Sequence, residues 1–117
     1  MYIALTIAKD RRMNDEQALE EEIVEKGLTA PRITPAMVDH AIMSEEYHVF
    51  DATQLTICVL TLRNGFTVTG ESACASPENF DEEIGQNIAR GNARDKIWSL
   101  MGFALMEQLS NKKVMSL

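Results

Sequence analysis

The chain has 117 residues and a formal net charge of −7, because 18 Asp and Glu outnumber 11 Lys and Arg. This balance argues against a protein that binds nucleic acid or membrane surfaces non-specifically, since such binding needs clustered basic residues. At this length we expect residues 1–117 to form a single domain. Two cysteines are too few for the disulfide framework of a small secreted protein, so we expect the protein in the cytoplasm.

Two interpretations remain open for the N-terminal residues 1–13. Residues 2–8 are apolar and rich in β-branched and aromatic side chains, which favours a short strand. The same residues would also suit a flexible leader. The run is too short to span a membrane in either case.

A helix is predicted from Asn14 to Gly27, since Asn14 is a favoured N-cap residue and Gly27 a favoured C-terminal stop. A narrow apolar stripe of Leu19, Ile23 and Val24 would face the core. The rest of this helix is either a well-solvated face or an acidic docking surface. Six acids would form that candidate docking surface: Asp15, Glu16, Glu20, Glu21, Glu22 and Glu25.

A second, short helix is predicted after Thr34, because Thr34 is a good N-cap and Pro35 suits the first helical position. We expect this helix to end near Ser44, with an extended segment over residues 47–50. Its inward-facing side chains would be Met37 and Ile42, with Val38 and Ala41 as further candidates.

The most specific local pattern is Asn64-Gly65 between two runs rich in β-branched residues, which predicts a β-hairpin. A two-residue loop would pair Arg63 with Phe66. The two cysteines would then lie on opposite faces, so we expect no disulfide between them. The better core face in this register is apolar and comprises Leu55, Ile57, Val59, Thr61, Phe66 and Val68.

A long C-terminal helix is predicted from about residue 79 to residue 109, followed by a frayed tail over residues 111–117. Eight of the ten residues from Ile97 to Met106 are apolar, so this part of the helix needs cover on every side. The hairpin supplies one cover and a second copy of the chain, most simply in a two-fold dimer, supplies another. The predicted self-association residues are Ile97, Trp98, Leu100, Met101, Phe103 and Leu105.

Residues suited to catalysis are few. His40 and His48 are the only imidazoles, and no spacing of His40, Glu45, Glu46, His48 and Asp51 matches a known metal site. Cys74 precedes a predicted helix N-terminus, where a thiol pKa can be lowered, but a small buried residue is the commoner role there. We therefore expect no catalytic residue, no metal and no cofactor.

Several segments together are similar to one protein family. They are Pro31-Arg-Ile-Thr-Pro35, Asn64 to Cys74, Asn79 to Gly85, Ala89-Arg90, Ala93, and Lys96-Ile-Trp98. Over about residues 28–109 the chain resembles the small tailed-phage proteins of the Gp-forty-nine-like, or gene-sixty-six-like, family. Met101 and Phe103 stand where the family pattern favours Glu and Tyr. The resemblance implies a phage or prophage product and supplies no activity, substrate or catalytic residue.

The sequence thus predicts an α+β fold, in which an antiparallel β-hairpin packs on a long C-terminal helix with shorter N-terminal helices around it. A third strand would come from residues 47–50 or 2–8. The favoured function is a non-enzymatic, homo-oligomeric binding protein that acts on a host or defence protein in the host cytoplasm. One alternative is a small-ligand binder with its pocket between hairpin and helix. Another is a small enzyme that uses Cys74 or the His40 and His48 region.

Overall fold

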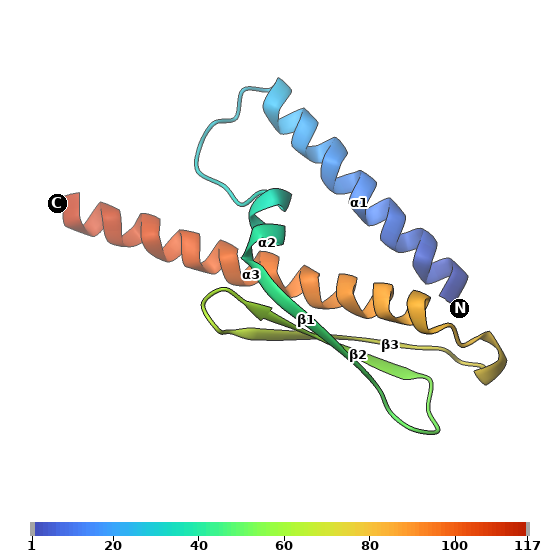
Figure 1. The fold of residues 1–117 in the computed structure, drawn as a ribbon. Helices are drawn as coiled ribbons and strands as arrows, with labels where there is room; N and C mark the ends of the chain where they lie inside the picture. The colour runs from blue at the N-terminus through green and yellow to red at the C-terminus, as the bar shows by residue number, and fades with distance from the viewer. Residues whose placement is uncertain (1, 117) are drawn as a thin grey trace.

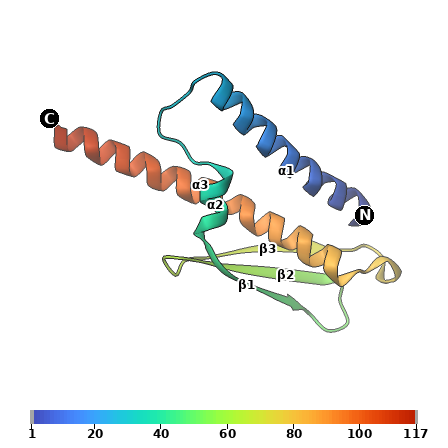
Figure 2. The same ribbon diagram turned by 45° about the horizontal axis from the view of Figure 1, so that its top comes forward.

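The computed structural model describes the backbone of residues 2–116 and the side chains of residues 14–112. Three strands form one antiparallel sheet in the order β1-β2-β3, and the first half of α3 packs across one face of it (Figures 1 and 2). α1 lies on the side of α3 that faces away from the sheet. The predicted α+β fold is therefore confirmed. Along the chain the elements are α1 (Tyr2–Glu25), α2 (Pro35–Ala41), β1 (Ile42–Val49), β2 (Leu55–Leu62), β3 (Thr67–Ala73), the 3₁₀ turn η1 (Pro77–Asn79) and α3 (Glu82–Ser116).

α1 is longer than predicted, because it begins at Tyr2 rather than after Asn14. The strand interpretation of residues 2–8 is wrong, because these residues are helical. No Gly or Pro precedes Lys26, so nothing in the sequence stops a helix from extending through Asn14 to Tyr2. The predicted end is confirmed: Gly27 has a φ of +66°, and the N–H of Leu28 donates to the carbonyl of Ile23, as in a Schellman motif.

α2 begins as predicted, since Oγ1 of Thr34 accepts a hydrogen bond from the N–H of Met37 at 3.2 Å. It ends earlier than predicted, at Ala41, and β1 starts at the next residue. The third strand is therefore confirmed, but it is longer than residues 47–50. Val38 is the fully buried side chain of α2, whereas Met37 is 40% exposed, so the inward position predicted for Met37 is wrong.

The hairpin exists as predicted, but its register differs by one residue. Leu62 pairs with Phe66 around a three-residue loop, the N–H of Gly65 donates to the carbonyl of Leu62, and Gly65 has a φ of +89°. This is the geometry of a type I turn followed by a glycine bulge. Asn-Gly is compatible with this turn as well as with a two-residue turn. As a result Cys58 lies opposite Gly70, not Glu71.

A one-residue change of register moves the partner strand's side chains to the other face, so the predicted core face is wrong. The buried face of β2 carries Thr56, Cys58, Leu60 and Leu62, whereas Leu55, Ile57, Val59 and Thr61 are only half-buried on the open face. Phe66 is 54% exposed, and Val68 alone of the predicted set is buried. The main core comprises Val38, Cys58, Leu60, Leu62, Val68, Ala89, Ala93 and Ile97.

The backbone of β3 approaches that of α3 closely at Gly70. A Cβ atom on Gly70 would lie 2.2 Å from the carbonyl oxygen of Ala89 and 2.2 Å from the amide nitrogen of Ala93. Only small residues on both elements allow the two backbones to approach so closely, and they explain how the helix lies directly on the sheet.

α3 starts after Asp81, whose Oδ1 accepts a hydrogen bond from the N–H of Ile84 at 2.9 Å. The helix continues through residues 111–116, so the tail predicted to fray is helical, and residue 117 lies outside the described part. A second, smaller core of Cys74 and Ile88 with Phe80 and Ile84 lies near its start. Among the residues that the structure describes, no helix has both the length and the apolar content needed to cross a membrane.

Candidate functional site

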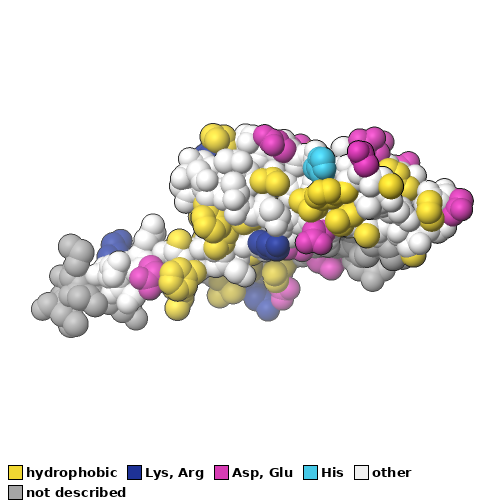
Figure 3. All heavy atoms as spheres, turned by 90° about the horizontal axis from the view of Figure 1, so that it is seen from below, with side chains coloured by type: hydrophobic (Ala, Val, Ile, Leu, Met, Phe, Trp, Pro, Cys, Tyr) yellow, Lys and Arg dark blue, Asp and Glu magenta, His cyan; other side chains and the backbone are white. Residues whose placement is uncertain are grey.

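The second half of α3 extends past the edge of the sheet, so no strand covers it (Figure 1). Three of its large apolar side chains are open to solvent: Leu100 is 38% exposed, Phe103 69% and Met106 68%. Figure 3 shows apolar side chains on this projecting segment. Exposed apolar side chains that neighbour one another on a helix form a patch, so this part of α3 is a candidate interaction surface.

The predicted self-association residues divide into two groups in the structure. Ile97 is fully buried in the core of its own chain, and Trp98 and Met101 pack against that core, so Ile97 is not available to a second copy. Leu100 and Phe103 are exposed, and Leu105 is half-buried. Met106 was not in the predicted set, although its position three residues after Phe103 on a helix could have indicated it.

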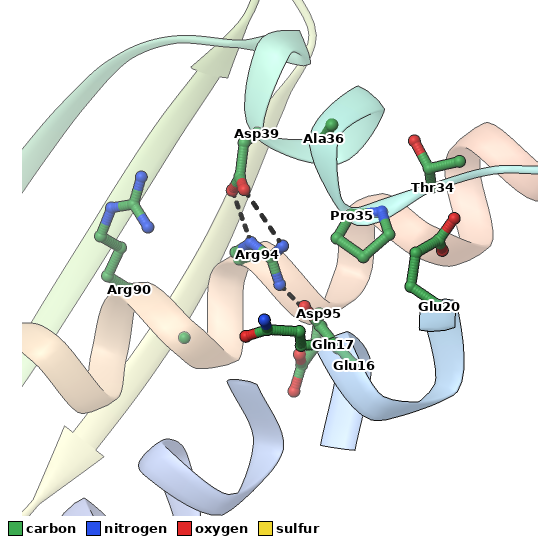
Figure 4. A pocket seen from close by; sticks show the side chains of 11 residues that line it. Glu16, Gln17, Glu20, Thr34, Pro35, Ala36, Asp39, Arg90, Arg94 and Asp95 are labelled. Carbon is green, nitrogen blue, oxygen red and sulfur yellow. Dashed lines mark hydrogen bonds and ion pairs between the residues drawn. The ribbon is translucent and has the colours of Figure 1, made fainter. Parts of the chain in front are cut away.

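A cavity of about 570 Å³ lies between α1, α2 and α3 (Figure 4). Its lining is rich in charged side chains, with carboxylates from all three helices and two arginines from α3. The lining residues are Glu16, Gln17, Glu20, Thr34, Pro35, Ala36, Asp39, Arg90, Gly91, Arg94 and Asp95. This cavity does not lie between hairpin and helix, where the sequence suggested a pocket, and at Gly70 the backbones of those two elements approach closely.

Arg94 connects the three helices around this cavity. Its Nε lies 2.8 Å from Oδ1 of Asp39 on α2, and its Nη1 lies 2.8 Å from Oε1 of Glu16 on α1. Figure 4 shows both contacts. Only 11% of the Arg94 side chain is exposed. Burial alone would lower the pKa of Arg94, but the hydrogen bonds to Asp39 and Glu16 outweigh it and hold that pKa above its ordinary value.

A second ion pair holds α1 about one helical turn further along. Arg32, in the loop before α2, donates two hydrogen bonds to the carboxylate of Glu20, one of them 2.8 Å long. The hydrogen bonds from Arg32 lower the pKa of Glu20. α1 is thus held to the rest of the molecule partly by charged groups. Its predicted inward stripe is wrong for Leu19 and Val24, which are 57% and 68% exposed, whereas Ile23 is half-buried.

The candidate acidic docking surface is divided by these contacts. Glu16 and Glu20 face the cavity and are paired with arginines, and Glu22 forms a 2.9 Å ion pair with Lys26. Asp15, Glu21 and Glu25 remain exposed. Six carboxylates in a short segment therefore do not form one continuous surface, because side chains on a helix point in all directions around its axis.

The face of the sheet that does not contact α3 is open. Apolar side chains gather in the middle of this face (Figure 3). It carries the half-buried Ile57 and Val59, and His48, whose ring contacts that of Phe50 edge-on with a 4.5 Å separation between centroids. Glu45, by contrast, forms an ion pair with Arg90 of α3. Among the described residues, no three His, Cys, Asp or Glu side chains lie close enough together to hold a metal ion.

Both cysteines are buried free thiols that belong to separate cores. The Cys74 thiol donates to the carbonyl of Ser76 at 3.2 Å and is 6% exposed. Burial, with Glu45 nearby, raises the pKa of the Cys58 thiol, and burial raises the pKa of the neighbouring Tyr47 hydroxyl to about 12. A raised pKa disfavours the reactive thiolate form of Cys58.

A family model described as "Phage protein (N4 Gp49/phage Sf6 gene 66) family" matches residues 33–109, which is more than half of the chain. The chain belongs to this family. The matched residues begin just before α2 and end within the projecting half of α3, so they include Leu100, Phe103 and Met106. α1, with its part of the cavity wall, lies outside the match. No curated protein and no solved structure matched the chain.

Proposed function

We propose that this member of the phage family is a non-enzymatic, homo-oligomeric binding protein that acts on a host or defence protein in the host cytoplasm. The observation that carries the proposal is the projecting half of α3, where Leu100, Phe103 and Met106 are exposed on a well-formed helix. Burying such side chains stabilises association by about 25 cal/mol per Å² of apolar surface. An uncovered apolar helix of this kind is the surface expected of a protein that contacts another protein.

Two surfaces serve two kinds of contact in this proposal. The projecting half of α3 joins copies of the chain, and the exposed acids of α1 (Asp15, Glu21 and Glu25) contact a basic surface of the host protein. The net charge of −7 supports the second contact, because opposite charges steer two proteins together and fix their orientation.

Affinity purification from host cells, followed by quantitative mass spectrometry, tests this proposal. We expect the wild type to retain one host protein well above background. The triple variant Asp15→Lys, Glu21→Lys, Glu25→Lys should lose that protein and still self-associate. Phe103→Glu should lose self-association. Retention of no host protein by the wild type would contradict the proposal.

A second candidate function is supported by the cavity between α1, α2 and α3. Its volume of about 570 Å³ is in the range of small-molecule sites. In this alternative the protein binds or sequesters a small ligand there, and Arg94 lies at the site. Native mass spectrometry of protein purified from infected cells should then detect a co-purified molecule, which the variant Arg94→Gln retains less well.

A further inference from the structure

Four residues form one stripe along the projecting part of α3. Lys96, Leu100, Phe103 and Glu107 follow one another at spacings of four, three and four residues, which places them on the same side of a helix. All four are exposed. The stripe therefore has two apolar residues at its centre, a positive charge at one end and a negative charge at the other.

Neither charged end is neutralised by the part of its own chain whose side chains the structure describes. Among the residues that the structure describes, neither Lys96 nor Glu107 forms an ion pair. They cannot pair with each other, because they lie eleven positions apart on the helix, a rise of about 16 Å.

We propose that the stripe is covered by the same stripe of a second copy, with the two α3 helices antiparallel. A two-fold axis that passes between Met101 and Gly102 places Leu100 of each copy against Phe103 of the other. The same axis places Lys96 of each copy against Glu107 of the other. This inference rests on the self-association in the proposed function and names its partner, orientation and register.

The charges select the antiparallel orientation. A parallel two-fold arrangement would bring Lys96 next to Lys96 and Glu107 next to Glu107, and like charges in contact destabilise an interface. The antiparallel arrangement forms two opposite-charge pairs, one at each end of the apolar centre. A surface that is complementary to itself in this way meets the requirement of a two-fold interface, in which both copies contribute the same patch.

Charge reversal with rescue tests the register. Sedimentation equilibrium of the full chain should show that Lys96→Glu and Glu107→Lys each weaken the dimer by about tenfold or more, since each substitution replaces two attractive pairs by two repulsive ones. The double variant Lys96→Glu, Glu107→Lys should return to within about threefold of the wild type. Glu21→Lys on α1, which makes the same charge change as Glu107→Lys outside the stripe, should leave the dimer unchanged. Circular dichroism of each variant checks that α3 remains helical.

The possible failures are distinguishable. A wild-type dimer that is indifferent to both reversals, or a double variant that stays monomeric, overturns the antiparallel register and leaves self-association standing. A wild type that stays monomeric at every concentration overturns self-association and this inference together. The stripe would then be available to bind a different protein.

Discussion

Gly70 is the residue on which the packing of the sheet against α3 depends. A Cβ atom there would lie 2.2 Å from backbone atoms of both Ala89 and Ala93, and backbone atoms cannot rotate away as a side chain can. We expect Gly70→Ala to lower the free energy of unfolding by about 3 kcal/mol, at the upper end for overpacked sites. Urea denaturation followed by circular dichroism measures this.

Gly102 provides the matched control for that substitution. A Cβ atom on Gly102 meets nothing within 4 Å, and Gly102 lies within α3. Gly102→Ala should therefore raise the free energy of unfolding by about 1 kcal/mol, the difference in helix propensity between the two residues. If both substitutions had the same effect, the close contact between β3 and α3 would not exist.

Tyr47 should make stability depend on pH in the alkaline range. Burial raises the pKa of Tyr47 to about 12 in the folded protein, so between its ordinary pKa of about 10 and that value the unfolded chain loses a proton that the folded chain keeps. This contribution is fully present below pH 10 and is lost as the pH rises to 12. Allowing for the partial exposure of the ring, we expect a loss of about 1 kcal/mol.

The difference between the wild type and Tyr47→Phe isolates this effect from other groups that titrate at high pH. Urea denaturation at pH 9 and at pH 11.5 should show a larger decrease in stability for the wild type than for Tyr47→Phe. Equal decreases in the two proteins would mean that Tyr47 ionises as freely in the folded state as in the unfolded state.

At the scale of the elements, a hairpin cross-link tests the register of β2 and β3. Thr61 lies opposite Thr67 in the structure, whereas a two-residue loop would place Thr61 opposite Val68. The double variant Thr61→Cys, Thr67→Cys should therefore form a disulfide under mild oxidation, because directly opposed residues bring their Cβ atoms within reach. Thr61→Cys, Val68→Cys should not. Mass spectrometry after thiol alkylation distinguishes the two outcomes.

The sequence was sufficient to predict this hairpin but not its register. Asn64-Gly65 is compatible with a two-residue turn and with a three-residue turn closed by a glycine bulge, and both faces of β2 carry apolar residues. The choice depends on Gly70, which must face α3, and that contact joins segments far apart in the chain. The caps at Thr34 and Gly27 were predictable because they depend on neighbouring residues only.

The attachment of α1 was not predictable from the sequence for a related reason. The amphipathic pattern placed Leu19 and Val24 inward, but Arg94 and Arg32 draw Glu16 and Glu20 toward the body of the molecule. Ion pairs between distant segments leave no periodic signal in a sequence. The cavity behind them was therefore also missed.

Arg94→Gln should loosen α1, because it leaves Glu16 and Asp39 beside the cavity without their partner. We expect a loss of about 1 to 3 kcal/mol in the local stability of residues 14–25, between the values for exposed and buried ion pairs. Amide hydrogen exchange measures this local stability separately for each region of the chain. Lys26→Gln, which removes an exposed ion pair with Glu22, should have little effect, and equal protection of α1 in both variants would contradict the role of Arg94.

At the scale of the whole molecule, the protein has a compact part and a projecting part. The sheet and the first half of α3 bury the main core, whereas the second half of α3 extends beyond it (Figure 1). The sequence predicted that one chain was too small to cover this helix, and Leu100 and Phe103 are indeed exposed. Which side of the helix is exposed depends on the position of the sheet, so Ile97 could not be separated from Leu100 by sequence alone.

The most direct test of this account is the mass of the untagged chain in solution, measured by sedimentation equilibrium over a wide range of concentration. The account predicts a reversible association to twice the chain mass of 13.1 kDa, abolished by Phe103→Glu and retained by Phe66→Glu, which alters an exposed aromatic residue outside α3. A wild-type chain that remains at 13.1 kDa at the highest concentration would contradict it.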